Sequence, residues 1–72
     1  MNIEQYIITE SDKKIYDLFS KIPHSEHYMR GLLTMLETED QKKILIEELE
    51  NGLTDIKTIM YLACDIADGL EV

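Results

Sequence analysis

The sequence has few of the residues that usually reveal the chemistry or the compartment of a small protein. Its 72 residues include one cysteine, one proline, no tryptophan and only 7% aromatic residues. A single cysteine, Cys64, excludes an internal disulfide and favours a reducing, cytoplasmic setting. The chain shows no basic stretch followed by an apolar run, so we expect no signal peptide. No apolar run approaches the roughly 20 residues of a membrane-spanning helix.

Positive charge is also scarce. Seven Lys and Arg residues stand against fifteen Asp and Glu residues, which gives a net charge of −8. Residues 1–36 carry a net charge of −1 and residues 37–72 carry −7. Such a chain is repelled by phosphate, so direct binding to DNA, RNA or an anionic membrane is not expected. The acidic half is either a solubilising surface or a surface for a basic partner.

Apolar residues recur with the spacing of amphipathic helices along the whole chain. At 44% hydrophobic residues, the chain can build a modest core. We therefore predict an all-α fold, a single helical domain over residues 1–72. It is a small bundle of four to five short helices, at about 2–9, 12–22, 26–37, 39–51 and 55–68.

The stretch Thr54–Gly69 carries the widest apolar arc, which spans roughly 200° instead of the ~100° of an ordinary surface helix. This width predicts that the last helix is the central, most buried one. The arc contains six residues, with Leu62 and Cys64 at its edges: Ile56, Ile59, Met60, Ala63, Ile66 and Ala67. Cys64 is then a small buried thiol, as free cysteines usually are.

Helix boundaries follow from capping signals. Thr38 and Gln41 fit a capping box at the start of the fourth helix, and Gly52 fits the left-handed residue after its end. Ser25 and Thr54 are the predicted N-caps of the third and last helices. Pro23 is expected to end the second helix.

Three local points stay open in the sequence. Asn2 is a candidate cap for a first helix, although the run Tyr6-Ile7-Ile8-Thr9 favours strand. Residues 2–22 also fit one continuous helix. Gly31, inside the third helix, is either merely tolerated there or marks a close approach of two helices.

No residue pattern points to catalysis or to a cofactor. His24 and His27 are three residues apart, but a metal site needs three or four converging ligands. Asp65 and Asp68 share the polar side of a helix and lack the loop of a calcium site. Glycine-rich phosphate loops and nucleophile motifs are absent from the sequence. We expect no enzyme activity, no cofactor and no metal.

The two helices around Gly52 have the order of a helix-turn-helix, in which the second helix would read DNA. The exposed side of that second helix would present Asp55, Lys57, Asp65 and Asp68. Three of these four residues are acidic and would be repelled by the phosphates along a DNA groove, so we do not expect DNA binding.

The sequence therefore favours a small acidic module that binds another protein, as an adaptor, inhibitor or regulator. The exposed methionines and tyrosines expected on such a surface are Tyr16, Met29, Met35 and Tyr61. The candidate partner-binding residues are Glu37, Glu39, Asp40, Ile44, Glu47, Glu48 and Glu50. One alternative is a nucleic-acid mimic, of a phage or host-defence type, that occupies a basic nucleic-acid-binding protein. Another is a self-associating homodimer that buries Ile44 and the arc of the last helix.

Overall fold

The computed structural model describes residues 3–69, and every regular element in that range is helical. A 3-10 helix η1 (Ile3–Tyr6) precedes four α-helices. These are α1 (Glu10–Phe19), α2 (Glu26–Met35), α3 (Glu39–Glu50) and α4 (Ile56–Ala67). The predicted small all-α bundle is confirmed.

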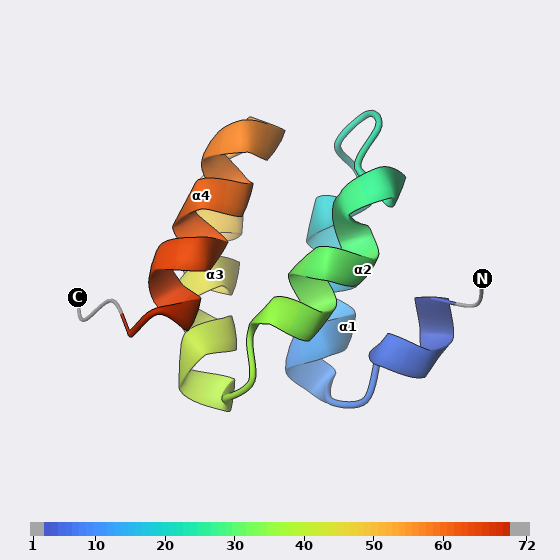
Figure 1. The fold of residues 1–72 in the computed structure, drawn as a ribbon. Coiled ribbons are helices and arrows are strands. Elements are labelled where there is room, and N and C mark those ends of the chain that lie inside the picture. Colours follow the sequence, from blue (N-terminus) through green and yellow to red (C-terminus); the bar gives the residue numbers. More distant parts are fainter. Residues whose placement is uncertain (1–2, 70–72) are drawn as a thin grey trace.

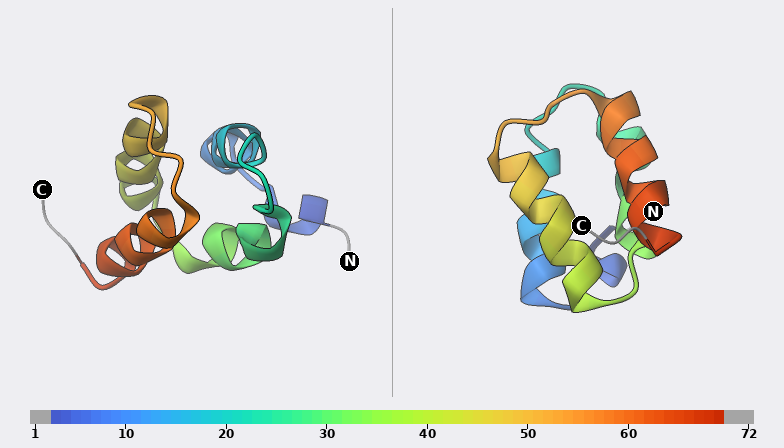
Figure 2. Two further views of the ribbon diagram at one scale, coloured as in Figure 1. Left: turned by 90° about the horizontal axis from the view of Figure 1, so that it is seen from above. Right: turned by 90° about the vertical axis from the view of Figure 1, so that its left-hand side faces the viewer.

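The four α-helices occupy the four corners of a bundle, as Figures 1 and 2 show from three sides. Neighbours in the chain, α1 with α2 and α3 with α4, run antiparallel. α1 and α3 lie side by side and run in the same direction. Thirteen apolar side chains fill the space between them: Ile15, Phe19, Ile22, Met29, Leu32, Leu33, Leu36, Leu45, Ile46, Leu49, Ile59, Ala63 and Ile66.

The last helix is not central, contrary to the expectation from its wide apolar arc. α4 lies at one corner, against α3 and α2 (Figure 2). Ile59, Ala63 and Ile66 are buried on its inner side. Ala67 and Cys64, which the arc includes, are exposed. Because two neighbouring helices cover only one side of α4, the expected burial of the Cys64 thiol is wrong.

The start of the chain differs from the predicted helix over residues 2–9. Only the single turn η1 forms, and Ile7 and Ile8 leave it in non-helical backbone. The β-branched residues of this stretch resist helix, and Thr9 takes the extended conformation of an N-cap. A continuous helix over residues 2–22 is therefore excluded. The proposed cap Asn2 lies outside the described residues.

Helix α1 begins and ends earlier than the predicted range 12–22. Thr9 caps it in a reciprocal box with Asp12, and it ends at Phe19. Turns then run from Ser20 to Ser25, and His24 takes a left-handed conformation with φ of 67°. Ser25 occupies the predicted N-cap position of α2, but its buried side chain makes no capping hydrogen bond.

The turn between α3 and α4 has the predicted cap. The Thr38–Gln41 box starts α3, and Gly52 follows its end with φ of 100°. The N–H groups of Gly52 and Leu53 donate to the carbonyls of Leu49 and Glu48, which is a Schellman ending. Thr54 does not cap α4.

Asp55 takes the place predicted for Thr54. Its side chain accepts hydrogen bonds from the backbone N–H and the hydroxyl of Thr58, at 3.0 and 2.6 Å. A carboxylate at this end of a helix is also favoured by the helix dipole. Helix α4 therefore begins one residue later than predicted.

We expect Gly31→Ala to stabilise the protein by about 0.5–1 kcal/mol, because alanine is the better helix former. Gly31 is exposed inside α2, and a Cβ added there meets no atom within 4 Å. The alternative of a close helix approach is thus excluded. Urea unfolding measures the change. Gly52→Ala is the matched control and should destabilise, since its φ of 100° strains any side chain. A destabilised Gly31→Ala variant would contradict the prediction.

Candidate functional site

The acidic residues predicted as a partner surface do not all face the same way. Helix α3 buries Lys42, Leu45, Ile46 and Leu49. Glu39 and Glu50 lie beside this buried stripe and reach across to α1. The remaining acids of the stretch project to solvent. The predicted surface therefore divides into an inner, structural part and an outer part.

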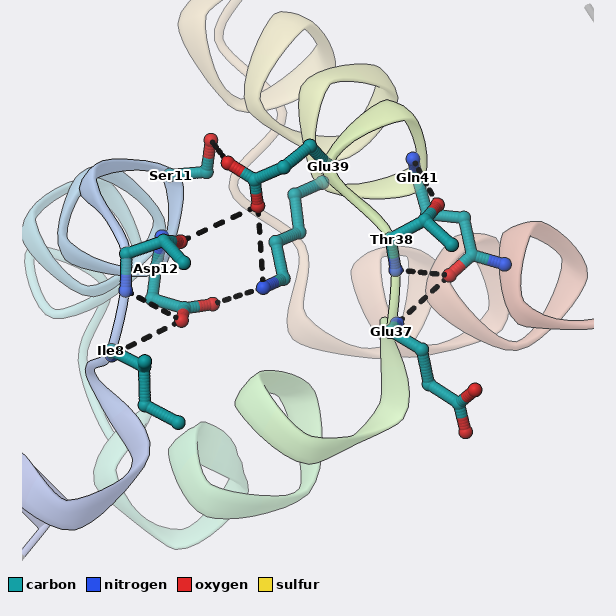
Figure 3. A network of polar contacts seen from close by, with 9 residues as sticks. Ile8, Ser11, Asp12, Glu37, Thr38, Glu39 and Gln41 are labelled. Carbon is teal, nitrogen blue, oxygen red and sulfur yellow. Dashed lines mark hydrogen bonds and ion pairs between the residues drawn. The ribbon is translucent and has the colours of Figure 1, made fainter.

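The inner part is built around a buried ion pair between α1 and α3 (Figure 3). The ammonium of Lys42 lies 3.0 Å from Oδ1 of Asp12, and the two side chains are 10% and 4% exposed. The same ammonium lies 3.4 Å from Oε2 of Glu39. Lys42 thus bridges a buried carboxylate and a half-exposed one. A buried lysine is stable only with such partners.

Asp12 also completes the cap of its own helix. Its Oδ2 accepts hydrogen bonds from the backbone N–H groups of Ile8 and Thr9, both at 3.1 Å. The hydroxyl of Thr9 in turn accepts from the N–H of Asp12 at 3.2 Å. One carboxylate therefore fixes the start of α1 and its contact with α3.

Glu39 adds a second connection between the same helices. Its Oε1 accepts a hydrogen bond from the hydroxyl of Ser11 at 3.0 Å, and its Oε2 accepts a longer one from Thr9 at 3.4 Å (Figure 3). Further along, the ammonium of Lys14 lies 3.0 Å from Oε2 of Glu50. Glu39 and Glu50 consequently hold α3 against α1.

The network shifts the pKa values of both buried groups. Burial acts to raise the pKa of Asp12, but the hydrogen bonds from Lys42, Thr9 and Ile8 and the charge of Lys42 outweigh it, so the pKa is lowered. Burial likewise acts to lower the pKa of Lys42. The hydrogen bonds and charges of Asp12 and Glu39 outweigh that effect and raise it. Both groups are charged at neutral pH.

The outer part contains Glu37, Asp40, Glu47 and Glu48, which are all exposed. Within residues 3–69 their carboxylates make no ion pair or hydrogen bond with another group. Figure 3 shows the Glu37 side chain directed away from the network. Ile44 is half-buried at the edge of the core. These five residues are what is left of the predicted partner surface.

A groove also runs between α1 and α3 on the outside of the network. It has a volume of about 650 Å³ and is lined by both signs of charge. Its residues Lys13 and Lys14 pair with Asp17 and Glu50, and Lys43 and Glu47 of α3 also line it.

The other residues considered for chemistry remain apart. His24, His27, Cys64, Asp65 and Asp68 are exposed and come from two different ends of the chain. Among residues 3–69, no three His, Cys, Asp or Glu residues form a group that could hold a metal ion. No helix in that range has the length and apolar character to cross a membrane.

Sequence reasoning missed the ion pair itself, although the sequence contains a signal for it. Lys42 lies three, four and seven residues before Leu45, Ile46 and Leu49, so it falls on their apolar stripe. Asp12 stands in the same relation to Ile15 and Phe19. A charged residue on the apolar stripe of each of two helices is the pattern of a buried pair. A projection of charged as well as apolar residues would have found it.

Comparisons with known proteins add no relative. No family model, no curated protein and no solved structure matches this chain.

We expect Lys42→Met to lower the free energy of unfolding by about 3 kcal/mol, because it leaves the Asp12 carboxylate buried without its cation. Chemical denaturation followed by circular dichroism measures the loss. Lys43→Met is the matched control on the next, exposed position and should change stability by less than about 0.5 kcal/mol. Equal effects of the two substitutions would contradict a stabilising role for the buried pair.

The two pKa shifts also predict how stability depends on pH. The lowered pKa of Asp12 means that its contribution is complete above its ordinary value of 3.8 and is lost as pH falls through the folded-state value. The raised pKa of Lys42 means that its contribution is complete below 10.5 and is lost as pH rises through the folded-state value.

The variant Asp12→Asn tests the predicted loss of stability at low pH. The stability difference between wild type and variant should stay constant near neutral pH and shrink only below pH 3.8. Urea unfolding at a series of pH values down to about pH 2 measures it. A stability difference that instead grows as the pH falls through about 5 would show that the pKa of Asp12 is raised.

Proposed function

We propose that this protein is a small acidic interaction module, without catalytic activity of its own, that binds another protein with a basic surface. The observation that carries the proposal is the set of unpaired carboxylates on and just before α3. Glu37, Asp40, Glu47 and Glu48 project to solvent, while Lys42 on the same helix is buried against Asp12. The exposed, unpaired charged groups of residues 37–50 are therefore these four acids and the single cation Lys43.

Complementary charge gives such a module fast association and selectivity among partners. Repulsion from phosphate argues against nucleic acid as the direct partner. A basic protein, including one whose basic surface normally holds nucleic acid, fits the same field. The free thiol of Cys64 is compatible with a reducing cytoplasm.

The homodimer has less support than the sequence suggested. The sequence suggests a homodimer because the apolar arc of the last helix is wider than the other helices of one chain are expected to cover. Within the single chain, Ile59, Ala63 and Ile66 are already at most 1% exposed. Ile44 is half-buried. What is left for a second copy is a narrow strip beside free carboxylates, and these repel their own copies.

Neutralising three outer acids tests the proposal. We expect Asp40→Asn/Glu47→Gln/Glu48→Gln to weaken binding to a partner about tenfold, since each exposed charge contributes about 0.5 kcal/mol. The control Glu10→Gln/Asp17→Asn/Glu26→Gln removes the same charge from α1 and α2 and should change binding much less. Affinity capture from host lysate, at low and high salt, identifies the partners for titration.

The expected partners are basic proteins whose retention falls steeply as salt rises. Neutral or acidic partners, or retention that salt does not alter, would overturn the proposal. Equal loss in both triple variants would show that only the total charge matters and that the outer side of α3 is not the contact.

A further inference from the structure

A pocket of about 300 Å³ lies between α1 and α2, on the side where η1 packs against α2 (Figure 2). Its apolar wall consists of Ile3 of η1, Tyr16 of α1 and Met29 of α2. The sequence placed Tyr16 and Met29 at the surface, together with Met35 and Tyr61. In the structure Met29 is buried, Tyr16 and Met35 are half-buried, and only Tyr61 of these four is exposed. Tyr16 and Met29 therefore line a pocket instead of an exposed surface.

The polar end of the pocket is formed by Ser25, the N-cap residue of α2. Ser25 is only 2% exposed, yet its hydroxyl makes no hydrogen bond within residues 3–69. The hydroxyl is not among the atoms that the protein encloses completely, so the little surface that Ser25 retains opens into the pocket. A buried hydroxyl without a hydrogen bond is unfavourable. Ser25 therefore points to a partner group from outside the chain.

Two backbone donors at the same end of α2 also lack an acceptor. The N–H groups of Ser25 and Tyr28 donate to the carbonyls of Ile22 and Ser25. Those of Glu26 and His27 donate to no group within residues 3–69. Free N–H groups at the start of a helix carry partial positive charge and attract an anionic oxygen. Together with the Ser25 hydroxyl, this helix start favours a carboxylate.

The rim of the pocket carries one charge of each sign. Glu26 and Arg30 lie one turn apart in α2, and both are exposed. The Glu26 carboxylate forms no ion pair or hydrogen bond within residues 3–69, so it can receive a cation. A purely anionic ligand would be repelled by Glu26 and by the net charge of −8. A ligand that carries an ammonium beside its carboxylate avoids this repulsion.

We propose that this pocket binds a small zwitterion, an α-amino acid with an apolar side chain. Its carboxylate accepts hydrogen bonds from the Ser25 hydroxyl and the start of α2, and its ammonium faces Glu26. Its side chain packs on Ile3, Tyr16 and Met29. The pocket lies between α1 and α2 and does not include the outer acids of α3, so this inference goes beyond the proposed function and is independent of it.

Three molecules with the same apolar body test the inference. Free phenylalanine carries both charged groups, 3-phenylpropanoate lacks the ammonium, and phenethylamine lacks the carboxylate. Each is titrated into the isotope-labelled full chain and followed by amide chemical shifts. We expect phenylalanine to bind with a dissociation constant on the order of 1 mM, about fivefold more tightly than either of the others. The shifts should be largest at Tyr16, Ser25, Glu26 and Met29.

The variant Ser25→Ala separates a ligand-binding role of the hydroxyl from a structural one. Because the hydroxyl has no partner within the folded chain, its removal should leave the free energy of unfolding unchanged or raise it. It should weaken phenylalanine and 3-phenylpropanoate about tenfold, since each loses a hydrogen bond to its carboxylate. Phenethylamine should be unaffected. A loss of stability in this variant would give the hydroxyl a structural role and overturn the inference.

The variant Glu26→Gln tests the contact with the ammonium. It should weaken phenylalanine and phenethylamine about threefold and should not weaken 3-phenylpropanoate. Glu47→Gln is the matched control, because it removes the same charge from α3, and it should change the binding of none of the three molecules. Equal effects of the two variants would show that only the total charge matters and would overturn the contact.

The remaining outcomes are equally decisive. Equal binding of the three molecules, or no shifts with phenylalanine at about 10 mM, would overturn the inference. Unchanged affinity of phenylalanine for Ser25→Ala would overturn it as well, because water would then serve the hydroxyl. The proposed function is tested by the charge of its protein partners and by salt, so it can fail or succeed separately.

Discussion

The buried pair of Asp12 and Lys42 is the interaction on which the arrangement of this bundle depends. It joins α1 to α3, two helices that are not neighbours in the chain, and it does so inside an apolar interface. Apolar side chains alone allow helices to slide or rotate, because many packings bury similar area. A buried charge tolerates one partner position only. The pair therefore selects the register in which the apolar stripes of α1 and α3 meet.

The same pair also determines which charges the outside of the protein shows. Lys42 is one of three cations in residues 37–72. Its ammonium forms ion pairs with the carboxylates of Asp12 and Glu39. Lys14 of α1 engages Glu50. These contacts leave Glu37, Asp40, Glu47 and Glu48 without an ion pair among residues 3–69. Folding thus separates the charges of one helix into a structural side and a free side.

Local signals were readable from the sequence wherever a backbone hydrogen bond dictates the residue. The Thr38–Gln41 box and the Gly52 ending were predicted because few side chains meet those geometries. Burial was harder to predict. The apolar arc of α4 predicts burial over its full width, whereas Ala67 and Cys64 are exposed in the structure. How many helices surround a given one is a property of the assembled chain, and apolar periodicity alone does not contain it. The candidate partner surface was hard to predict for the same reason. Glu39 and Glu48 belong to one helix and differ only in the direction that they face.

The outer side of α3 also carries one apolar residue, Ile44, which is half-buried at the edge of the core. Solubility requires only scattered charge, and an apolar residue beside Glu48 does not serve it. Single exposed apolar residues are common on any protein. Ile44 lies on the side of α3 that carries Gln41, and the hydrogen bond from Gln41 Nε2 to the carbonyl oxygen of Ile66 holds that side beside α4. The pairing of α3 with α4 therefore decides how this side of α3 is oriented, which the apolar pattern of α3 alone does not determine.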